Sequence, residues 1–253
     1  MTQRTEPFAF SGSTGAELAG VLHVPDGSAR GSVLMAHCFT CSKDLHTMTR
    51  LAAGLADAGY AVLRFDFTGL ADSGGDFEDK TVSRNVTDLV RAATELIQHG
   101  YGPCALVGHS LGGAAALLAA HRLKTVRSVV VLGAPSSPRH VQHLFADRLE
   151  EIEAEGTAEV TIAGRSFPIT QEFVADLEQH DQAGRVADLD RPLLVLHALD
   201  DEVVGVDEGE RIFATARQPK AFVPLFASDH LLTDREAAEA ALTQVVDWFA
   251  RTL

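Results

Sequence analysis

The sequence predicts an α/β fold, in which helices cover both faces of a mostly parallel central sheet of about eight strands. Short apolar runs typical of strands alternate along the chain with longer stretches of helical periodicity, which predicts the parallel sheet. The first two strand-like runs are joined by a short turn, which predicts an antiparallel edge. The alternation is interrupted once, at residues 136–190, and this interruption predicts a small inserted cap.

Most of the predicted sheet comes from the first half of the chain. Residues 6–11 and 17–24 are the opening pair, and the turn between them contains two glycines. The next strands are the apolar runs at residues 31–37, 61–66, 104–108 and 128–132. The helices between these strands are predicted at residues 46–58, 81–99 and 111–123, and Gly59 and Gly100 follow the first two.

The polar segment at residues 136–190 is mostly helical in pattern and contains one predicted hairpin around residues 163–165. Ligands of open α/β sheets bind at the carboxyl ends of the strands, so a cap inserted there would cover the binding region. We therefore divide the chain into a core of residues 1–135 and 191–253 and a cap of residues 136–190. The core resumes with strands at 193–196 and 221–226 and with helices at 207–216 and 233–252.

The composition limits the partners that we expect. A chain of 253 residues that is 46% hydrophobic can bury a substantial core. The formal net charge of −14 repels nucleic acid and anionic lipid at long range, so we expect neither nucleic acid nor a membrane as a partner. We find no apolar signal segment, and no apolar run approaches the roughly 18 residues of a membrane span. We therefore expect a soluble, cytoplasmic protein, and the pattern leaves a homodimer open.

The strongest local motif occupies residues 108–112, with the sequence Gly-His-Ser-Leu-Gly, and joins a predicted strand to a predicted helix. The pattern G-x-S-x-G in this setting is typical of a strained turn that presents the serine hydroxyl to a substrate. The two glycines remove Cβ atoms that would clash where the strand turns sharply into the helix. We therefore predict that Ser110 is a nucleophile.

A serine hydroxyl is a weak nucleophile and needs a general base. Of the eleven histidines, five follow the beginning of the predicted cap, namely His140, His143, His180, His197 and His230. The first three lie in the predicted cap, and His197 ends a strand. His230 lies in the loop between the last strand and the closing helix, where the base must lie, so we predict that His230 is the base.

The acid should follow the preceding strand, where Asp200, Asp201 and Glu202 compete. The acid must accept a hydrogen bond from the imidazole, and local physics cannot choose between Asp200 and Asp201. The tetrahedral oxyanion needs two backbone N–H donors. We assign them to Leu111, directly after the nucleophile, and to Phe39, in the loop after the strand at residues 31–37.

Together these motifs resemble those of the α/β-hydrolase superfamily of serine hydrolases over essentially the full chain. The matching segments are residues 37–39, residues 64–69 and the motif at 108–112. In that superfamily the acid commonly lies four residues after a strand-end histidine, which favours Asp201, four residues after His197. A closer similarity, carried also by residues 38–44 and 229–233, is to the hydrolase half of bacterial α/β hydrolase–OsmC fusion proteins. The resemblance implies the α/β-hydrolase fold and an esterase-type activity.

We therefore predict a serine esterase that hydrolyses small to medium carboxylic esters through this triad and an acyl-enzyme intermediate. The expected partner is a small-molecule ester, and we expect no cofactor and no metal. A thioesterase, amidase or peptidase with the same triad is an alternative, as is a non-catalytic ligand-binding module on the same fold. His109, Phe145 and Phe173 are predicted to contact the substrate.

The three cysteines are Cys38, Cys41 and Cys104, an odd number at low density that argues against a disulfide framework. Cys38 and Cys41 form a C-x-x-C pair. A zinc site would need a second pair, and a redox pair would favour a helix N-terminus. We expect the two residues to pack within the oxyanion loop, with a role in modulating the active site as the alternative.

Overall fold

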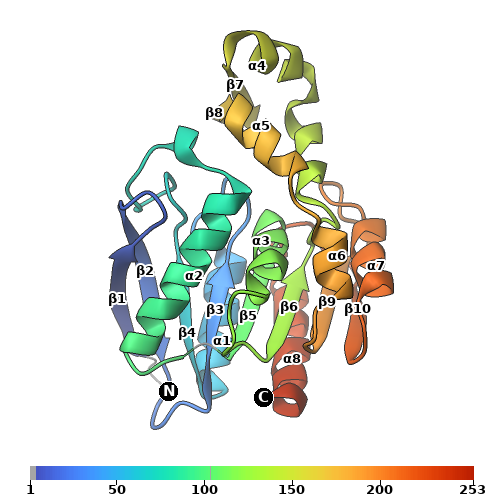
Figure 1. Cartoon of the computed structure of the whole chain (residues 1–253). Helices are drawn as coiled ribbons and strands as arrows, with labels where there is room; N and C mark the ends of the chain where they lie inside the picture. Colours follow the sequence, from blue (N-terminus) through green and yellow to red (C-terminus); the bar gives the residue numbers. More distant parts are fainter. Residues whose placement is uncertain (1–3, 103) are drawn as a thin grey trace.

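The computed structural model describes residues 4–102 and 104–253, so the first three residues of the predicted core lie outside the described residues. Its central sheet has eight strands in the order β1-β2-β4-β3-β5-β6-β9-β10 (Figure 1). β1 (Arg4–Ser11) and β2 (Glu17–Val24) pair antiparallel, and β2 also pairs antiparallel with β4 (Tyr60–Phe65). The other neighbours are parallel, which confirms the mostly parallel sheet with an antiparallel edge.

The interior strands are buried on both faces. The strands not yet given are β3 (Gly31–Ala36), β5 (Ala105–His109), β6 (Ser128–Leu132), β9 (Leu193–Ala198) and β10 (Lys220–Leu225). β4, β5, β6 and β9 are buried along their whole length, whereas the edge strand β10 is mostly half-buried. Strands covered on both faces are continuously apolar, which is why the sequence shows them as short apolar runs.

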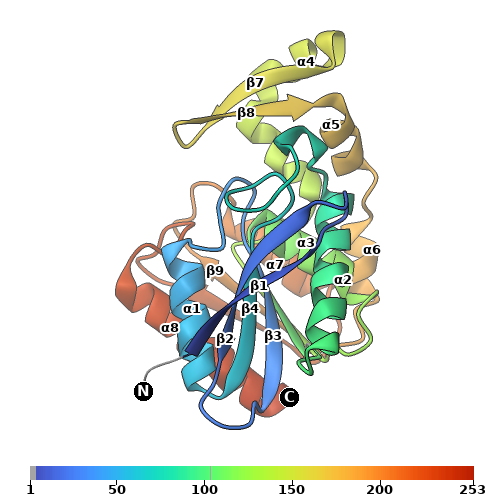
Figure 2. The same cartoon turned by 90° about the vertical axis from the view of Figure 1, so that its left-hand side faces the viewer.

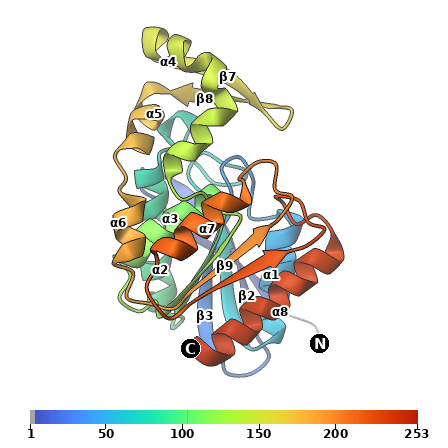
Figure 3. The same ribbon diagram turned by 90° about the vertical axis from the view of Figure 1, so that its right-hand side faces the viewer.

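Two layers of helices cover the sheet (Figures 1 and 3). One layer contains α1 (His46–Asp57) and α8 (Arg235–Thr252), and the other contains α2 (Val82–Gln98), α3 (Leu111–Ala120) and α7 (Val206–Thr215). Successive residues of a strand point to opposite faces. Val33 of β3 therefore packs in the core under α1 and α8, while the adjacent Leu34 packs in the core under α2 and α3.

The segment between β6 and β9 builds a cap over the carboxyl ends of the strands (Figures 1 and 2). It contains η2 (Pro138–Arg148), α4 (Leu149–Glu155), the hairpin of β7 (Thr157–Ile162) and β8 (Arg165–Thr170), and α5 (Gln171–Glu178). The hairpin turn lies where it was predicted and uses Ala163 and Gly164 with positive φ. The hairpin meets the core at the short helix η1 (Phe77–Asp79), where the rings of Phe77 and Phe167 lie 4.8 Å apart.

The last part of the predicted cap lies with the helical layer. α6 (Gln182–Ala187) packs beside α3 and α7, below the hairpin (Figure 1). The side-chain amide of Gln182 donates a hydrogen bond of 2.7 Å to the carbonyl of Pro135, which ties both ends of the inserted segment together. The cap boundary at residue 190 therefore stays a prediction. No helix within residues 4–102 and 104–253 is long and apolar enough to cross a membrane.

Candidate active site

Ser110 lies at the sharp turn between β5 and α3. Its backbone has φ 55° and ψ −128°, a conformation that costs a non-glycine residue about 1–3 kcal/mol and that clusters at functional sites. The flanking glycines make the turn sterically allowed. A Cβ on Gly108 would lie 2.5 Å from the Cα of Gly113, and a Cβ on Gly112 would lie 2.2 Å from the carbonyl oxygen of His37. The second contact shows that the loop after β3 lies directly against the beginning of α3.

The structure brings Ser110, His230 and Asp201 together in one hydrogen-bonded chain. The Oγ of Ser110 lies 3.0 Å from Nε2 of His230, and Nδ1 of the same imidazole lies 2.8 Å from Oδ2 of Asp201. His230 lies in the loop between β10 and α8, as predicted, and Asp201 lies in the loop after β9. The two imidazole nitrogens therefore serve different partners, which leaves Nε2 to accept the serine proton while Nδ1–H donates to the carboxylate.

The structure places Asp201, and not Asp200, against His230. Oδ1 of Asp201 accepts hydrogen bonds from the N–H groups of Val203 (2.9 Å) and Val204 (2.8 Å), so both carboxylate oxygens have donors. Burial alone would raise the pKa of Asp201, but the hydrogen bonds from His230 and these two N–H groups bring the pKa below its usual value. The side chain of Asp200 is exposed and makes no hydrogen bond with His230.

Two further residues support the histidine, and sequence reasoning assigned neither to this task. Nε2 of His109 lies 2.7 Å from the carbonyl oxygen of His230, and the His109 side chain is only 2% exposed. His109 thus contacts the loop of His230 from a buried position, and its predicted contact with substrate stays a prediction. Gly133 follows β6 with φ 52°, and a Cβ there would lie 3.2 Å from Oδ2 of Asp201 and 3.3 Å from Nδ1 of His230. A Cβ would therefore crowd that hydrogen bond, and the positive φ also favours glycine here.

The two predicted oxyanion donors remain unpaired within the described chain. Neither the N–H of Phe39 nor the N–H of Leu111 finds an acceptor among those residues. Both belong to segments that meet at the contact between Gly112 and His37. A pair of free N–H groups beside a nucleophile is what an oxyanion site requires, because the charge that they bind exists only during the reaction.

The cysteine pair of this loop is a disulfide, which corrects the expectation that Cys38 and Cys41 simply pack there. Their Cα atoms are 5.4 Å apart, within the range of a disulfide, and the bond encloses Phe39 and Thr40. The C-x-x-C spacing was the available signal, but pairing depends on how the loop bends, which the sequence did not show. Cys104 is a free, buried cysteine.

The cap closes over the oxyanion loop through aromatic contacts. The ring of Phe39 stacks on Phe173 of α5 with centroids 5.0 Å apart and planes 7° apart. Phe145 and Phe173 are buried, so in this arrangement both fill the contact between cap and core, and their role toward a substrate stays a prediction. The ammonium of Lys80 lies 5.4 Å from the centre of the Phe39 ring and has no hydrogen-bond acceptor among the described residues. Burial lowers the pKa of Lys80 to about 7.

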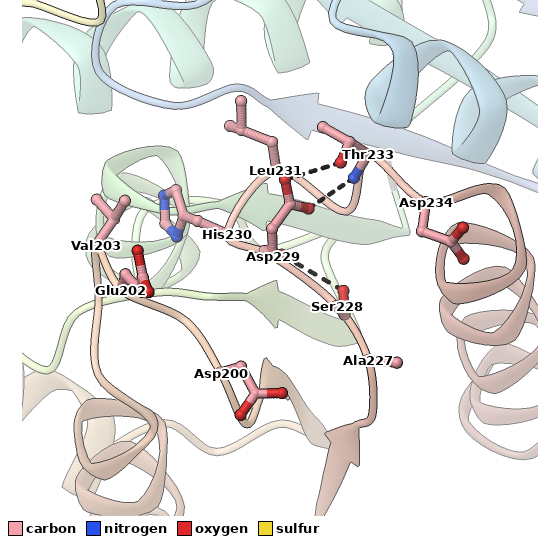
Figure 4. A pocket seen from close by; sticks show the side chains of 10 residues that line it. All are labelled: Asp200, Glu202, Val203, Ala227, Ser228, Asp229, His230, Leu231, Thr233 and Asp234. Carbon is pink, nitrogen blue, oxygen red and sulfur yellow. Dashed lines mark hydrogen bonds between the residues drawn. The ribbon is translucent and has the colours of Figure 1, made fainter.

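A cleft of about 580 Å³ opens next to His230 (Figure 4). Its walls come from the loops after β9 and β10. The carboxylates that line it are Asp200, Glu202, Asp229 and Asp234. Asp229 is held in place because it accepts hydrogen bonds from the N–H and the hydroxyl of Thr233. Across the described ranges, no group of three or more His, Cys, Asp or Glu side chains is arranged to hold a metal ion.

Solved structures with the same architecture include an esterase domain. The esterase domain of a Rhodothermus marinus protein is 36% identical to this chain, superposes with a TM-score of 0.81, and is matched over 98% of this chain and 99% of that one. Est1E from Butyrivibrio proteoclasticus, solved with ferulic acid bound, has a TM-score of 0.81 and 18% identity, with 97% and 98% of the two chains covered. The second match, at this low identity, shows a shared fold.

Curated relatives and a family model agree with this architecture. Mouse palmitoyl-protein thioesterase ABHD10, mitochondrial, is 29% identical over 154 residues, which are 58% of this chain and 50% of that protein. The chain thus spans about half the length of the curated relatives that it matches first. The model of the alpha/beta hydrolase family matches residues 33–248, from β3 to the closing helix. The chain belongs to the alpha/beta hydrolase family.

Proposed function

We propose that this hydrolase is a serine esterase that cleaves small to medium carboxylic esters with Ser110, His230 and Asp201 as its triad. The observation that carries the proposal is the unbroken hydrogen-bond chain from the carboxylate through the imidazole to the hydroxyl. Its order lets the imidazole accept the serine proton while the carboxylate stabilises the cation that forms. The esterase domain from Rhodothermus marinus, at 36% identity, supports the ester as the substrate class.

The reaction follows from the positions of these groups. Nε2 of His230 takes the proton as Oγ of Ser110 attacks the ester carbonyl carbon, and the N–H groups of Phe39 and Leu111 donate to the oxyanion. The tetrahedral intermediate collapses and expels the alcohol, which receives the proton from His230. Water, deprotonated in turn by His230, then attacks the acyl-enzyme, and a second collapse releases the carboxylic acid and restores Ser110.

Two features near the proposed triad bear on where the ester binds. The stacked rings of Phe39 and Phe173 bring the cap onto the oxyanion loop. A cleft of about 580 Å³ lies beside His230. We therefore assign the alcohol part of the ester to this cleft. The acyl part lies toward the cap.

A thioester is the second candidate substrate. The observation in its favour is the 29% identity with a relative named as a palmitoyl-protein thioesterase. The triad and the oxyanion donors would serve a thioester in the same way, because the same acyl carbonyl is attacked. The length of the acyl chain separates the two proposals, since a palmitoyl chain is much longer than the acyl part of a small ester.

The test is a panel of p-nitrophenyl esters from acetate to palmitate, with acyl thioesters of the same lengths and one p-nitroanilide. We expect the highest kcat/KM for the short esters and loss of all turnover above background in Ser110→Ala. Higher kcat/KM for the long thioesters would favour the thioesterase. A wild-type protein that is folded but inactive on the whole panel would contradict the proposal and favour a binding module.

A further inference from the structure

The disulfide in the oxyanion loop encloses the residue that donates to the oxyanion in the proposed reaction. Cys38 and Cys41 close a small ring whose two inner residues are Phe39 and Thr40. The ring begins two residues after β3 ends at Ala36, and the loop that carries it packs against the beginning of α3 at Gly112. The position of the Phe39 N–H therefore depends on the shape of this ring.

Few backbone hydrogen bonds hold the ring. Residues 39 and 40 form a turn, and in the described part of the chain no N–H group of residues 38–40 donates a hydrogen bond. The carbonyl of Cys38 lies 2.8 Å from Nδ1 of His37, which anchors the start of the ring. After the ring, the N–H and the ammonium of Lys43 both donate to Asp66, at 2.6 Å and 2.8 Å. The loop is thus fixed on both sides of the ring, and the disulfide is the covalent constraint between these anchors.

The same ring also meets the cap. Nη1 of Arg165, at the tip of the β7–β8 hairpin, donates a hydrogen bond of 3.1 Å to the carbonyl of Thr40. The ring of Phe39 stacks on Phe173 of α5. Both contacts need the turn at residues 38–41 to keep its shape, so the disulfide positions the oxyanion donor and the cap contact together.

We propose that the Cys38–Cys41 disulfide is a redox-modification site that positions the Phe39 N–H, so that the oxidised chain is the efficient catalyst and reduction by a dithiol lowers kcat. This inference rests on the proposed esterase function. Without the bond, the four residues regain backbone freedom, and the donor no longer points steadily at the oxyanion. Binding of the ester depends on other walls of the site, so KM should change less than kcat.

The chemistry of the switch balances with a dithiol as the reductant. Cys41 is half-buried and Cys38 is buried, so the first thiolate of the dithiol attacks Sγ of Cys41 and Cys38 leaves as a thiolate. The second thiol of the reductant then loses its proton and attacks the reductant's other sulfur, which is bonded to Cys41 in the mixed disulfide. This attack releases the Cys41 thiolate. The protein gains two electrons and the two protons that the dithiol gives up, and the reductant leaves as a cyclic disulfide.

The test compares kcat and KM for p-nitrophenyl acetate in three states of the wild type: oxidised, reduced with dithiothreitol and desalted, and reoxidised. A thiol titration after desalting counts the thiols that reduction has freed. Removal of one oxyanion donor costs about 10²–10³ in kcat, and a donor that is only loosened should cost about tenfold to a hundredfold. Reoxidation should restore kcat. The kcat of Cys38→Ser/Cys41→Ser should equal that of the reduced enzyme, and dithiothreitol should not change it. Cys104→Ala is the matched control and should behave like the wild type.

Several outcomes would overturn the inference. One is a reduced wild type, with Cys38 and Cys41 titrating as thiols, that keeps its kcat within about twofold of the oxidised value. Another is a disulfide that dithiothreitol leaves intact in the folded protein. If the double variant does not fold, the wild-type states alone decide the matter. An enzyme that turns over equally in both redox states refutes this inference but leaves the esterase proposal standing, whereas an oxidised wild type without turnover refutes both.

Discussion

The molecule contains a second cluster with the same three side-chain types as the proposed triad, and the two differ in how they are connected. In the triad, His230 lies between Ser110 and Asp201 and uses a different nitrogen for each. In the second cluster, Asp176 accepts a hydrogen bond from the Ser83 hydroxyl and lies 3.1 Å from Nε2 of His180. The same Nε2 of His180 is 3.5 Å from the serine oxygen.

The order of the contacts decides what each cluster can do. The Ser83 hydroxyl donates its proton to the carboxylate of Asp176. The proton is therefore not directed at an imidazole whose second nitrogen is bound to a carboxylate, as the proposed mechanism requires. Ser83 also lies in the first turn of α2, and its N–H donates to Asp176 at 3.1 Å. Asp176 of α5 therefore binds the N-terminus of α2 and fastens the cap to the core. The same three side-chain types therefore do not by themselves make a catalytic site. Mutations in the proposed triad should lower activity, whereas mutations in the second cluster should lower stability.

The largest expected difference is between the two serines. Ser110→Ala should lower kcat/KM for a short p-nitrophenyl ester by at least about 10³-fold, because the nucleophile is lost. Ser83→Ala should keep kcat/KM within about twofold, because its hydroxyl takes no part in the chemistry. Steady-state kinetics on both purified variants checks this. A comparable loss in Ser83→Ala would break the distinction between the clusters.

The two carboxylates should separate activity from stability. Asp201→Asn should lower kcat by about 10²–10⁴-fold, because an amide cannot stabilise the imidazolium. Asp176→Asn should leave kcat nearly unchanged and lower the free energy of unfolding by about 1–3 kcal/mol, through weaker hydrogen bonds at the N-terminus of α2. Kinetics and urea unfolding of the two variants measure these effects side by side. An Asp201→Asn protein with wild-type kcat would mean that another residue is the acid.

A fall in pH should lower the stability of the folded protein through a buried histidine, His109. Burial, with a smaller contribution from His230, lowers the pKa of His109 to about 3 from its usual 6.5. Between these two pH values the unfolded chain binds a proton that the folded chain does not, so the free energy of unfolding falls as the pH drops below 6.5. One such group contributes a slope of about 1.4 kcal/mol per pH unit.

His109→Gln should therefore reduce the slope of the unfolding free energy against pH between about pH 6 and pH 4, by up to about 1.4 kcal/mol per pH unit. Ser83→Ala is the matched control and should keep the wild-type slope over most of this range, since it removes no titratable group. Urea unfolding at successive pH values gives the slopes. Equal slopes for wild type and His109→Gln would show that His109 accepts a proton in the folded protein.

The sequence predicted the parts of this molecule that depend on local patterns. Apolar runs placed all eight strands of the central sheet, and the motif at residues 108–112 placed Ser110 between β5 and α3. His230 could be predicted because the last strand and the closing helix leave one histidine between them. Asp201 needed a family spacing, because the neighbouring Asp200 has the same local chemistry, and the hydrogen bonds and burial that tell them apart appear only in the structure.

The features that escaped prediction depend on contacts between distant segments. The carbonyl of His230 meets His109 across 121 residues of chain, and Ser83 meets Asp176 across 93. The disulfide is local in sequence, but its formation depends on the bend of a loop that is shaped by α3 and by the cap. The position of α6 beside α3 is likewise set by packing, since a short polar helix has no pattern that assigns it to cap or core.

The most direct test of the account is covalent labelling with a fluorophosphonate, followed by mass spectrometry of the labelled peptide. The reagent reacts with a serine whose hydroxyl is deprotonated by a base beside an oxyanion site. We expect one adduct per chain, on Ser110, which disappears in Ser110→Ala, forms far more slowly in His230→Ala and persists in Ser83→Ala. A folded wild type that remains unlabelled at Ser110, or that carries the adduct on Ser83, would contradict the proposal that Ser110 is the nucleophile.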